Sequence, residues 1–174
     1  DEETFDRSGQ HDVSLFFDGL EQLVTTDRRV LDIGCGIGRM DKHVAPRVQH
    51  LTGIDVSGEM VRMARERLAH LPNVEFVEGD GWTLKPLADG GLDLVFSHIV
   101  FQHMPRKVAT SYFGEVHRVL KSGGDFVFQM PEAVPGAPVD PPEEDTFEMR
   151  FYAESDLRES LEALGFTWAE CRRF

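Results

Sequence analysis

The stretch that decides the fold is VLDIGCGIGRM, residues Val30–Met40, in which an apolar run ends in an aspartate and leads into glycines at alternate positions. Gly34, Gly36 and Gly38 occupy positions where residues of higher helix or strand propensity would otherwise stand. Glycine adopts positive φ at little cost and, without a Cβ, lets a ligand approach the backbone closely. The stretch therefore predicts a strand that enters a helix through a turn suited to holding a ligand.

Short apolar runs recur on both sides of this turn, and segments of helical periodicity lie between them. One such segment follows Ser57, which is a candidate N-cap, and another runs from Val108 to Leu120. Alternating strands and helices predict parallel strands joined by right-handed crossovers. The expected fold is a doubly wound α/β domain with a mostly parallel sheet and helices on both faces. The predicted strands are Val30–Ile33, His50–Ile54, Val74–Val77, Leu92–Phe96 and Asp125–Gln129.

The chain is expected to form a single domain, since 174 residues are enough for one ordinary core. An apolar helical pattern covers Val13–Val24, Ser155 is a candidate cap for a late helix, and Phe166–Cys171 is a candidate final strand. The expected parts are an N-terminal helical lid (1–28), a cofactor-binding core (29–130), a proline-rich substrate loop (131–150) and a C-terminal helix and strand (151–174).

Composition and charge favour small-molecule chemistry. The chain has 31 acidic and 18 basic residues, a formal charge of −13, which disfavours a nucleic-acid partner because phosphates would be repelled. With no uncharged apolar stretch of ~20 residues and no basic-apolar leader, we expect no membrane association and a cytoplasmic location. Cys35 and Cys171 form no C-x-x-C motif, so neither a disulfide framework nor a metal site is expected.

The glycine spacing argues against a dinucleotide. A dinucleotide fingerprint is G-x-G-x-x-G, but Arg39 stands where its third glycine would be. Asp32, just before the turn, would repel a phosphate and could instead bind a cationic amino group. A zwitterionic ligand with a sulfonium group fits better than NAD. A nicotinamide oxidoreductase and a turn without any ligand are the alternatives.

Five motifs together resemble those of the class I S-adenosylmethionine-dependent methyltransferases: VLDIGCGIGR, LTGIDVS, VEFVEGDGW, LDLVFSHIVFQHM and VLKSGGDFVFQMPE. The resemblance covers almost the whole chain. It implies a Rossmann-like methyltransferase fold, S-adenosyl-L-methionine as cofactor and S-adenosyl-L-homocysteine as product. The family sheet usually ends in a sixth strand and an antiparallel seventh. This chain offers one candidate strand there, so we expect the seventh to be missing.

The resemblance also implies a role for individual residues. Asp32 would lie near the cofactor's amino group, Asp55 would accept bonds from the ribose hydroxyls, and Asp80 would accept from the adenine amino group, with Gly81 and Trp82 beside the ring. Asp55 alone would serve any nucleoside, Asp80 could be a turn aspartate, and Trp82 could be a packing residue. The full expected cofactor set is Asp32, Gly34, Cys35, Gly36, Gly38, Asp55, Val56, Asp80, Gly81, Trp82 and Ser97.

Methyl transfer requires the nucleophile, the methyl carbon and the sulfur to be held in line, and a base only if the acceptor must lose a proton. His98 and His103 follow the fourth strand and are the candidate bases, with packing or cofactor-edge roles as alternatives. Their spacing does not match the helical i, i+4 pair of a metal site. The expected activity is methylation of an O, N or C nucleophile on a small molecule. The alternative is a noncatalytic S-adenosylmethionine-binding or interaction protein.

Overall fold

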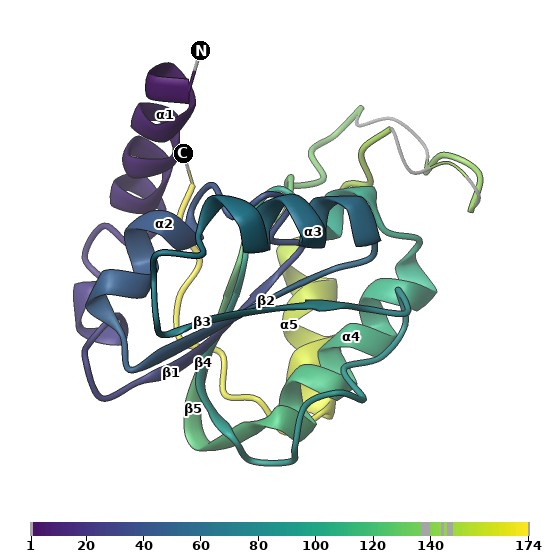
Figure 1. Cartoon of the computed structure of the whole chain (residues 1–174). Helices are drawn as coiled ribbons and strands as arrows, with labels where there is room; N and C mark the ends of the chain where they lie inside the picture. The colour runs from purple at the N-terminus through teal and green to yellow at the C-terminus, as the bar shows by residue number, and fades with distance from the viewer. Residues whose placement is uncertain (1, 137–139, 144, 146–147, 174) are drawn as a thin grey trace.

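The computed structural model describes residues 2–136, 140–143, 145 and 148–173. At its centre is a sheet of five parallel strands in the order β3-β2-β1-β4-β5 (Figure 1). The chain runs outward from β1 on one side and resumes from β4 on the other, so the switch point lies between β1 and β4. Ligands of doubly wound sheets bind outside the carboxyl ends of the strands at this point. The strands are β1 (Arg29–Ile33), β2 (His50–Asp55), β3 (Val74–Glu78), β4 (Leu92–Ser97) and β5 (Leu120–Phe128).

Helices cover both faces of the sheet (Figure 1). They are α1 (Glu2–Phe16), α2 (Asp41–Val44), α3 (Gly58–Arg67), α4 (Arg106–Val119) and α5 (Glu154–Ala163), with short 3-10 turns η1 (Glu21–Leu23), η2 (Ala45–Arg47) and η3 (Phe101–His103). Within the described ranges, none of these helices is long and apolar enough to cross a membrane.

The central strand β1 contributes to the cores on both faces. Val30 packs with α1 and α2, whereas Leu31 and Ile33 pack with α4 and α5. Successive side chains of a strand point to opposite faces, and a strand buried on both reads as a continuous apolar run. The expected doubly wound α/β fold is confirmed. Ser57 caps α3 as expected, because its Oγ accepts a bond from the amide of Met60 at 3.4 Å.

One strand differs from its expected bounds. β5 was expected over Asp125–Gln129 but begins at Leu120, directly after α4. Leu120, expected to be helical, instead pairs with Leu92, and the register shifts beyond that pair. Gly123 has φ of 79° in this part of the strand. A glycine inside a strand commonly marks a bulge, so here it marks an irregular strand and not the end of a helix.

Two helix boundaries also differ. The helix expected over Val13–Val24 lies earlier, as α1, and the chain then turns through Gly19, whose φ is 66°. Glycine tolerates this left-handed conformation and so ends the helical run. Ser155 is not the N-cap of α5, which begins at Glu154 without a side-chain cap. The Ser155 hydroxyl donates to Asp156 instead.

The expected final strand is wrong: the described part of 166–171 contains no strand. The Phe166 ring packs 5.2 Å from His117 and 5.9 Å from Phe126, centroid to centroid. Side-chain packing against α4 and β5, without a ladder of backbone bonds, therefore positions this segment. The described sheet accordingly has neither the sixth nor the seventh strand of the family pattern.

The proline-rich segment is irregular where it is described. An isolated parallel bridge joins Glu132 to Tyr152, and Arg106 of α4 pairs with Asp140, with Nη2 and Oδ1 2.9 Å apart. Six positions of the expected substrate loop, 137–139, 144 and 146–147, lie outside the described residues.

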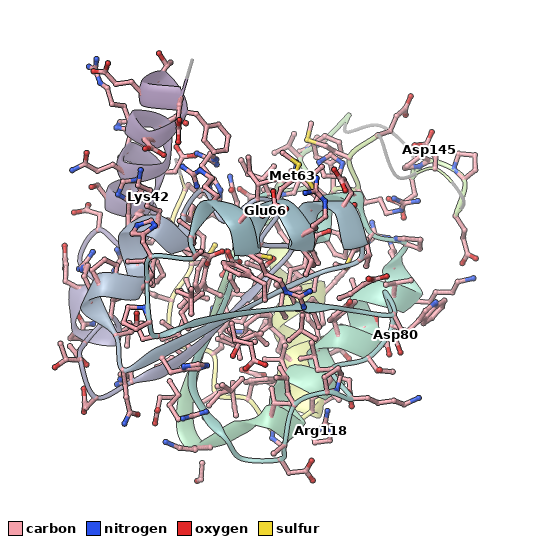
Figure 2. The ribbon with its side chains drawn as sticks, in the orientation of Figure 1. Lys42, Met63, Glu66, Asp80, Arg118 and Asp145 are labelled. Atoms are coloured by element: carbon pink, nitrogen blue, oxygen red, sulfur yellow. The ribbon has the colours of Figure 1, made fainter. Side chains whose placement is uncertain are left out.

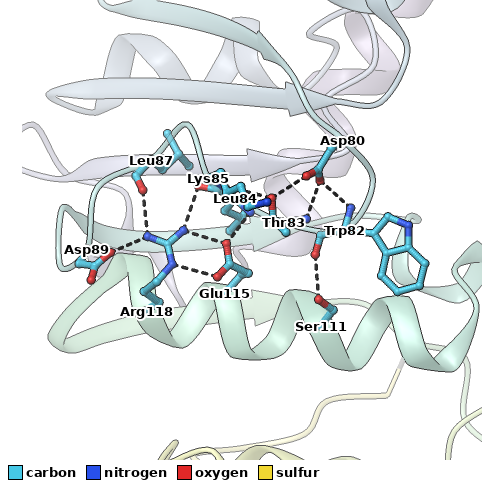
Figure 3. Close-up of polar contacts among 10 residues, drawn as sticks. All are labelled: Asp80, Trp82, Thr83, Leu84, Lys85, Leu87, Asp89, Ser111, Glu115 and Arg118. Carbon is cyan, nitrogen blue, oxygen red and sulfur yellow. Dashed lines mark hydrogen bonds and ion pairs between the residues drawn. The ribbon is translucent and has the colours of Figure 1, made fainter.

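The connection between β3 and β4 is fastened to α4 by polar bonds (Figure 3). The Arg118 guanidinium donates to the carbonyls of Leu84 and Leu87, both at 3.0 Å, and to Asp89 at 2.6 Å. Glu115 binds the same guanidinium and accepts from the Leu84 amide at 2.7 Å. The Arg118 side chain thus fixes the connection between β3 and β4, which contains no helix in this structure.

We expect Arg118→Ala to lower the free energy of unfolding by about 2–3 kcal/mol, because several charge-assisted bonds are lost together. The free energy of unfolding of Arg118→Lys should lie between those of the parent and Arg118→Ala, since lysine keeps the charge but lacks the planar guanidinium group. Urea denaturation measures both. The control is Arg62→Ala on α3, whose exposed pairs with Glu59 and Glu66 should contribute less than about 1 kcal/mol. Equal losses in the two alanine variants would contradict the role assigned to Arg118.

Candidate cofactor and acceptor site

The three glycines of the turn after β1 are required for different structural reasons. All adopt positive φ: 79° at Gly34, 55° at Gly36 and 75° at Gly38. A Cβ at Gly34 would come within 2.4 Å of Val100, and one at Gly38 within 2.7 Å of Leu68. A Cβ at Gly36 would meet nothing within 4 Å. Gly34 and Gly38 are therefore needed for packing, whereas Gly36 faces open space where a ligand can approach.

The turn is bonded to the end of β2. The amides of Gly34 and Cys35 donate to the Ile54 carbonyl at 2.8 and 3.1 Å. The Gly36 amide donates to Asp55 Oδ2, and the Ser57 amide donates to Asp55 Oδ1, both at 2.9 Å. Each carboxylate oxygen can still accept a bond from a ligand hydroxyl. Asp55 is thus fixed beside the open space at Gly36.

Two carboxyl groups are buried beneath the turn. Asp32 on β1 is 5% exposed, and Asp41 at the start of α2 is fully buried. Each of these two carboxyl groups acts on the pKa of the other. Burial raises the pKa of Asp32 well above its usual range and raises the pKa of Asp41 to about 7. The sequence did not point to Asp41, because an aspartate at a helix start is ordinarily exposed.

Asp80 lies just after β3 (Figure 2) and closes a tight local turn (Figure 3). Its Oδ1 accepts from the amides of Trp82 and Thr83 at 2.8 and 2.6 Å, and its Oδ2 accepts from the Thr83 hydroxyl at 2.7 Å. These bonds, that of the Thr83 hydroxyl foremost, lower the pKa of Asp80 to about 2. The turn role is therefore observed, and the side chain remains an anion that can accept further bonds from a ligand.

An exposed apolar strip borders Asp80. Val56 is 61% exposed and Trp82 is 46% exposed. A Cβ at Gly81 would lie 3.4 Å from a methyl group of Val56, so these two residues are neighbours. The Ser111 hydroxyl of α4 holds the Trp82 carbonyl at 2.9 Å (Figure 3). Exposed apolar groups beside a carboxylate can accommodate a flat ring that carries an N–H donor.

Two residues of the expected set are committed to the protein interior. Ser97 is fully buried, and its hydroxyl donates to the Ile33 carbonyl at 2.9 Å, which links β4 to β1. Cys35 is 6% exposed, and burial raises the pKa of its thiol, so the sulfur stays protonated. Both side chains therefore point into the protein interior and not toward a ligand.

The two candidate bases lie in different surroundings. The half-buried His98 ring packs edge-on against Phe16 of α1, with centroids 5.3 Å apart, and burial lowers the pKa of His98. His103 on η3 has Nε2 3.0 Å from Gln102 Nε2. Its Nδ1 is buried and has no hydrogen-bond partner among the described residues. Burial thus favours the neutral form of His98, and one ring nitrogen of His103 is left without a hydrogen-bond partner among the described residues.

Arg150, which sequence reasoning missed, positions η3. It is 2% exposed, its amide donates to the Gln102 carbonyl at 2.8 Å, and its Nη1 donates to the His103 carbonyl at 3.2 Å. Its Nη2 holds the carbonyls of Pro142 and Asp145. A charged residue in a proline-rich stretch gives no local signal of burial. The residue connects the described part of the loop to the segment that carries His103.

Helix α1 lies against the turn and the segment after β4. A Cβ at Gly9 would come within 2.5 Å of the Arg39 carbonyl, so α1 touches the backbone of the turn. Arg39 also pairs with Asp12 at 2.5 Å. This helix brings Phe16 to His98. Residues on α1 are therefore placed beside the expected site.

The chain is similar to known methyltransferases. A family model described as a methyltransferase domain matches residues 30–124. The trans-aconitate 2-methyltransferase of Rhodopseudomonas palustris (strain BisB18) is 36% identical over 118 residues, which are 66% of this chain and 43% of that protein. This chain therefore spans less than half the length of that curated relative.

Two solved structures share the fold. The YcgJ protein of Bacillus subtilis superposes with a TM-score of 0.72 at 26% identity, covering 89% of this chain and 68% of that one. The [4+2]-cyclase SpnF superposes with a TM-score of 0.71 at 27% identity, covering 92% of this chain and 56% of that one. Together with the match over residues 30–124, these findings show that the chain belongs to the class I S-adenosylmethionine-dependent methyltransferase family.

We expect Asp55→Ala to weaken S-adenosylhomocysteine binding by about 1.5–3 kcal/mol, the scale of hydrogen bonds to a charged group. Gly36→Val should abolish binding, because the side chain would occupy the open space and valine disfavours positive φ. Isothermal titration calorimetry measures both affinities. Asp27→Ala, at an exposed loop aspartate before β1, is the control and should bind as the parent does. Unchanged affinity in folded Gly36→Val would show that the ligand lies elsewhere.

Proposed function

We propose that the protein transfers a methyl group from S-adenosylmethionine to a nucleophilic O, N or C atom of a small molecule. The observation that carries the proposal is the open space at Gly36 next to Asp55, at the switch point of the sheet. Asp55 would accept bonds from the ribose hydroxyls, while the turn backbone from Gly34 to Gly38 approaches the rest of the ligand. Both groups are already held in place without the ligand.

The adenine end and the methionyl end of the ligand would contact different side chains. Val56, Gly81 and Trp82 would contact the adenine ring, and Asp80 would accept from its amino group. Asp32 would lie near the methionyl ammonium. The observed exposure of Val56 and Trp82 and the anionic state of Asp80 support this orientation.

S-adenosylmethionine supplies a methyl carbon activated by a positive sulfur. The chain's task is then to hold the acceptor in line with that carbon and to exclude water, which can contribute up to ~7–11 kcal/mol. Where the acceptor must lose a proton, His98 or His103 would take it. His103 is the better candidate, because its Nδ1 has no hydrogen-bond partner among the described residues, whereas the His98 ring packs against Phe16.

The acceptor is proposed to be small, bound between η3, α1 and the described part of the loop over 131–150. The relative named for trans-aconitate makes that carboxylate-bearing molecule the first compound to test. The SpnF neighbour is a reason to follow the reaction directly, since a shared fold does not fix the chemistry.

We expect S-adenosylmethionine and S-adenosylhomocysteine to raise the melting temperature and NAD to leave it unchanged. With trans-aconitate and a panel of small hydroxyl, amine and carboxylate compounds, S-adenosylhomocysteine should accumulate in a coupled homocysteine assay. Binding without product for the whole panel would favour the noncatalytic alternative. Binding of NAD alone would contradict the proposal.

We expect His103→Ala to lower kcat by ~10²-fold or more if the imidazole takes a proton, with cofactor affinity nearly unchanged. If the ring only shapes the pocket, KM for the acceptor should change more than kcat. His70→Ala, at an exposed position after α3, is the control. Parent values of kcat and KM in both His98→Ala and His103→Ala would remove both histidines from the mechanism.

A further inference from the structure

The buried carboxyl pair beneath the turn is not neutralised by other groups. Neither oxygen of Asp41 has a hydrogen-bond partner among the described residues, and the Asp32 carboxyl group interacts with it electrostatically. Asp41 has no exposed surface, and Asp32 retains 5%. Two ionised carboxylates in contact repel strongly where water is excluded. Without a cation beside them, the two groups are stable together only if they share a proton.

The surrounding charges do not replace that proton. Asp55 at the end of β2 adds a negative charge. Arg39 in the turn and Arg67 at the end of α3 are the cations that act on the pair, but each is already paired with an aspartate of α1. The Cys35 thiol is neutral, because burial raises its pKa. Among the described residues, no unpaired cation therefore neutralises the carboxyl groups of Asp32 and Asp41.

We infer that Asp41 is a positioning residue that keeps a shared proton on Asp32 in the free protein, and that the ligand's ammonium group replaces this proton on binding. The inference rests on the proposed function, in which the methionyl ammonium lies near Asp32. Asp41 is too deeply buried to touch the ligand, so it acts through Asp32.

The exchange balances in charge and atoms. In the free protein the pair holds one proton and carries a charge of −1. On binding, the O–H bond of the shared proton breaks, the proton leaves to solvent, and the pair becomes −2. The ammonium keeps its own protons, adds +1 and donates N–H bonds to Asp32. The site therefore carries the same net charge before and after, which avoids an uncompensated buried charge.

The exchange makes binding depend on pH. The pair's pKa values are raised in the folded protein, so its contribution to folding stability is present at acidic pH and is lost as pH rises through the raised pKa, about 7 for Asp41. Ligand affinity has the opposite trend, because at higher pH no proton has to be displaced. The rise ends near pH ~8, where an α-amino group itself loses its proton.

The test is calorimetric titration with S-adenosylhomocysteine from about pH 5.5 to about 7.5, in buffers of different ionisation enthalpy. We expect a proton to be released on binding and the affinity to rise by up to about tenfold per pH unit. 5′-Methylthioadenosine, which has the adenosine but no ammonium, should bind without this proton release. Asp41→Asn should bind S-adenosylhomocysteine with little pH dependence, since an amide can donate to Asp32 and needs no shared proton.

Asp89→Asn, at an exposed aspartate outside the site, is the control and should keep the parent's pH dependence. Equal pH dependence in the parent and in Asp41→Asn, or no proton released by the parent, would overturn the inference while leaving the proposed function intact. Failure of the parent to bind S-adenosylhomocysteine at any pH would overturn both. If Asp41→Asn does not fold by circular dichroism, the comparison of the two ligands on the parent decides.

Discussion

The hydrogen bond from the Gly36 amide to Asp55, at 2.9 Å, is the constraint on which the site depends. It joins the turn after β1 to the end of β2, and the amides of Gly34 and Cys35 strengthen that junction through the Ile54 carbonyl. The parallel pairing of β1 with β2 places these groups at the same edge of the sheet. A backbone turn and a carboxylate are thereby fixed beside open space before any ligand binds, so little ordering entropy remains to be lost.

The same edge is strongly acidic. Asp41 and Asp55 both lie within electrostatic reach of Asp32, in a chain whose formal charge is −13. Repulsion and burial together favour a ligand that brings a positive charge and hydroxyl donors, and disfavour a pyrophosphate. This selectivity arises from the protein's own charges and does not depend on the identity of the acceptor. In the proposed function the acceptor would lie between α1, η3 and the described part of the loop, and Arg150 holds η3 in position there.

Much of the sheet and part of the site could be predicted from the sequence. Buried parallel strands read as apolar runs, so the strands and the residues at their carboxyl ends, such as Asp55, were evident. Other features depend on packing between segments that are distant in sequence. These are the hydrogen bond from the Ser97 hydroxyl to the Ile33 carbonyl and the burial of Asp41 and Arg150. The sequence around such a residue is the same whether its side chain is exposed or buried, so it cannot predict which of the two occurs. The segment after α5 was misassigned for a similar reason, because its extended pattern gave no information on whether β5 would pair with it.

The most direct test of the site is a crystal structure of the protein with S-adenosylhomocysteine. The account predicts the ribose hydroxyls within hydrogen-bonding distance of Asp55, the adenine beside Val56 and Gly81, and ligand atoms in the open space at Gly36. Density for the ligand at another place on the sheet, with the space at Gly36 empty, would contradict it.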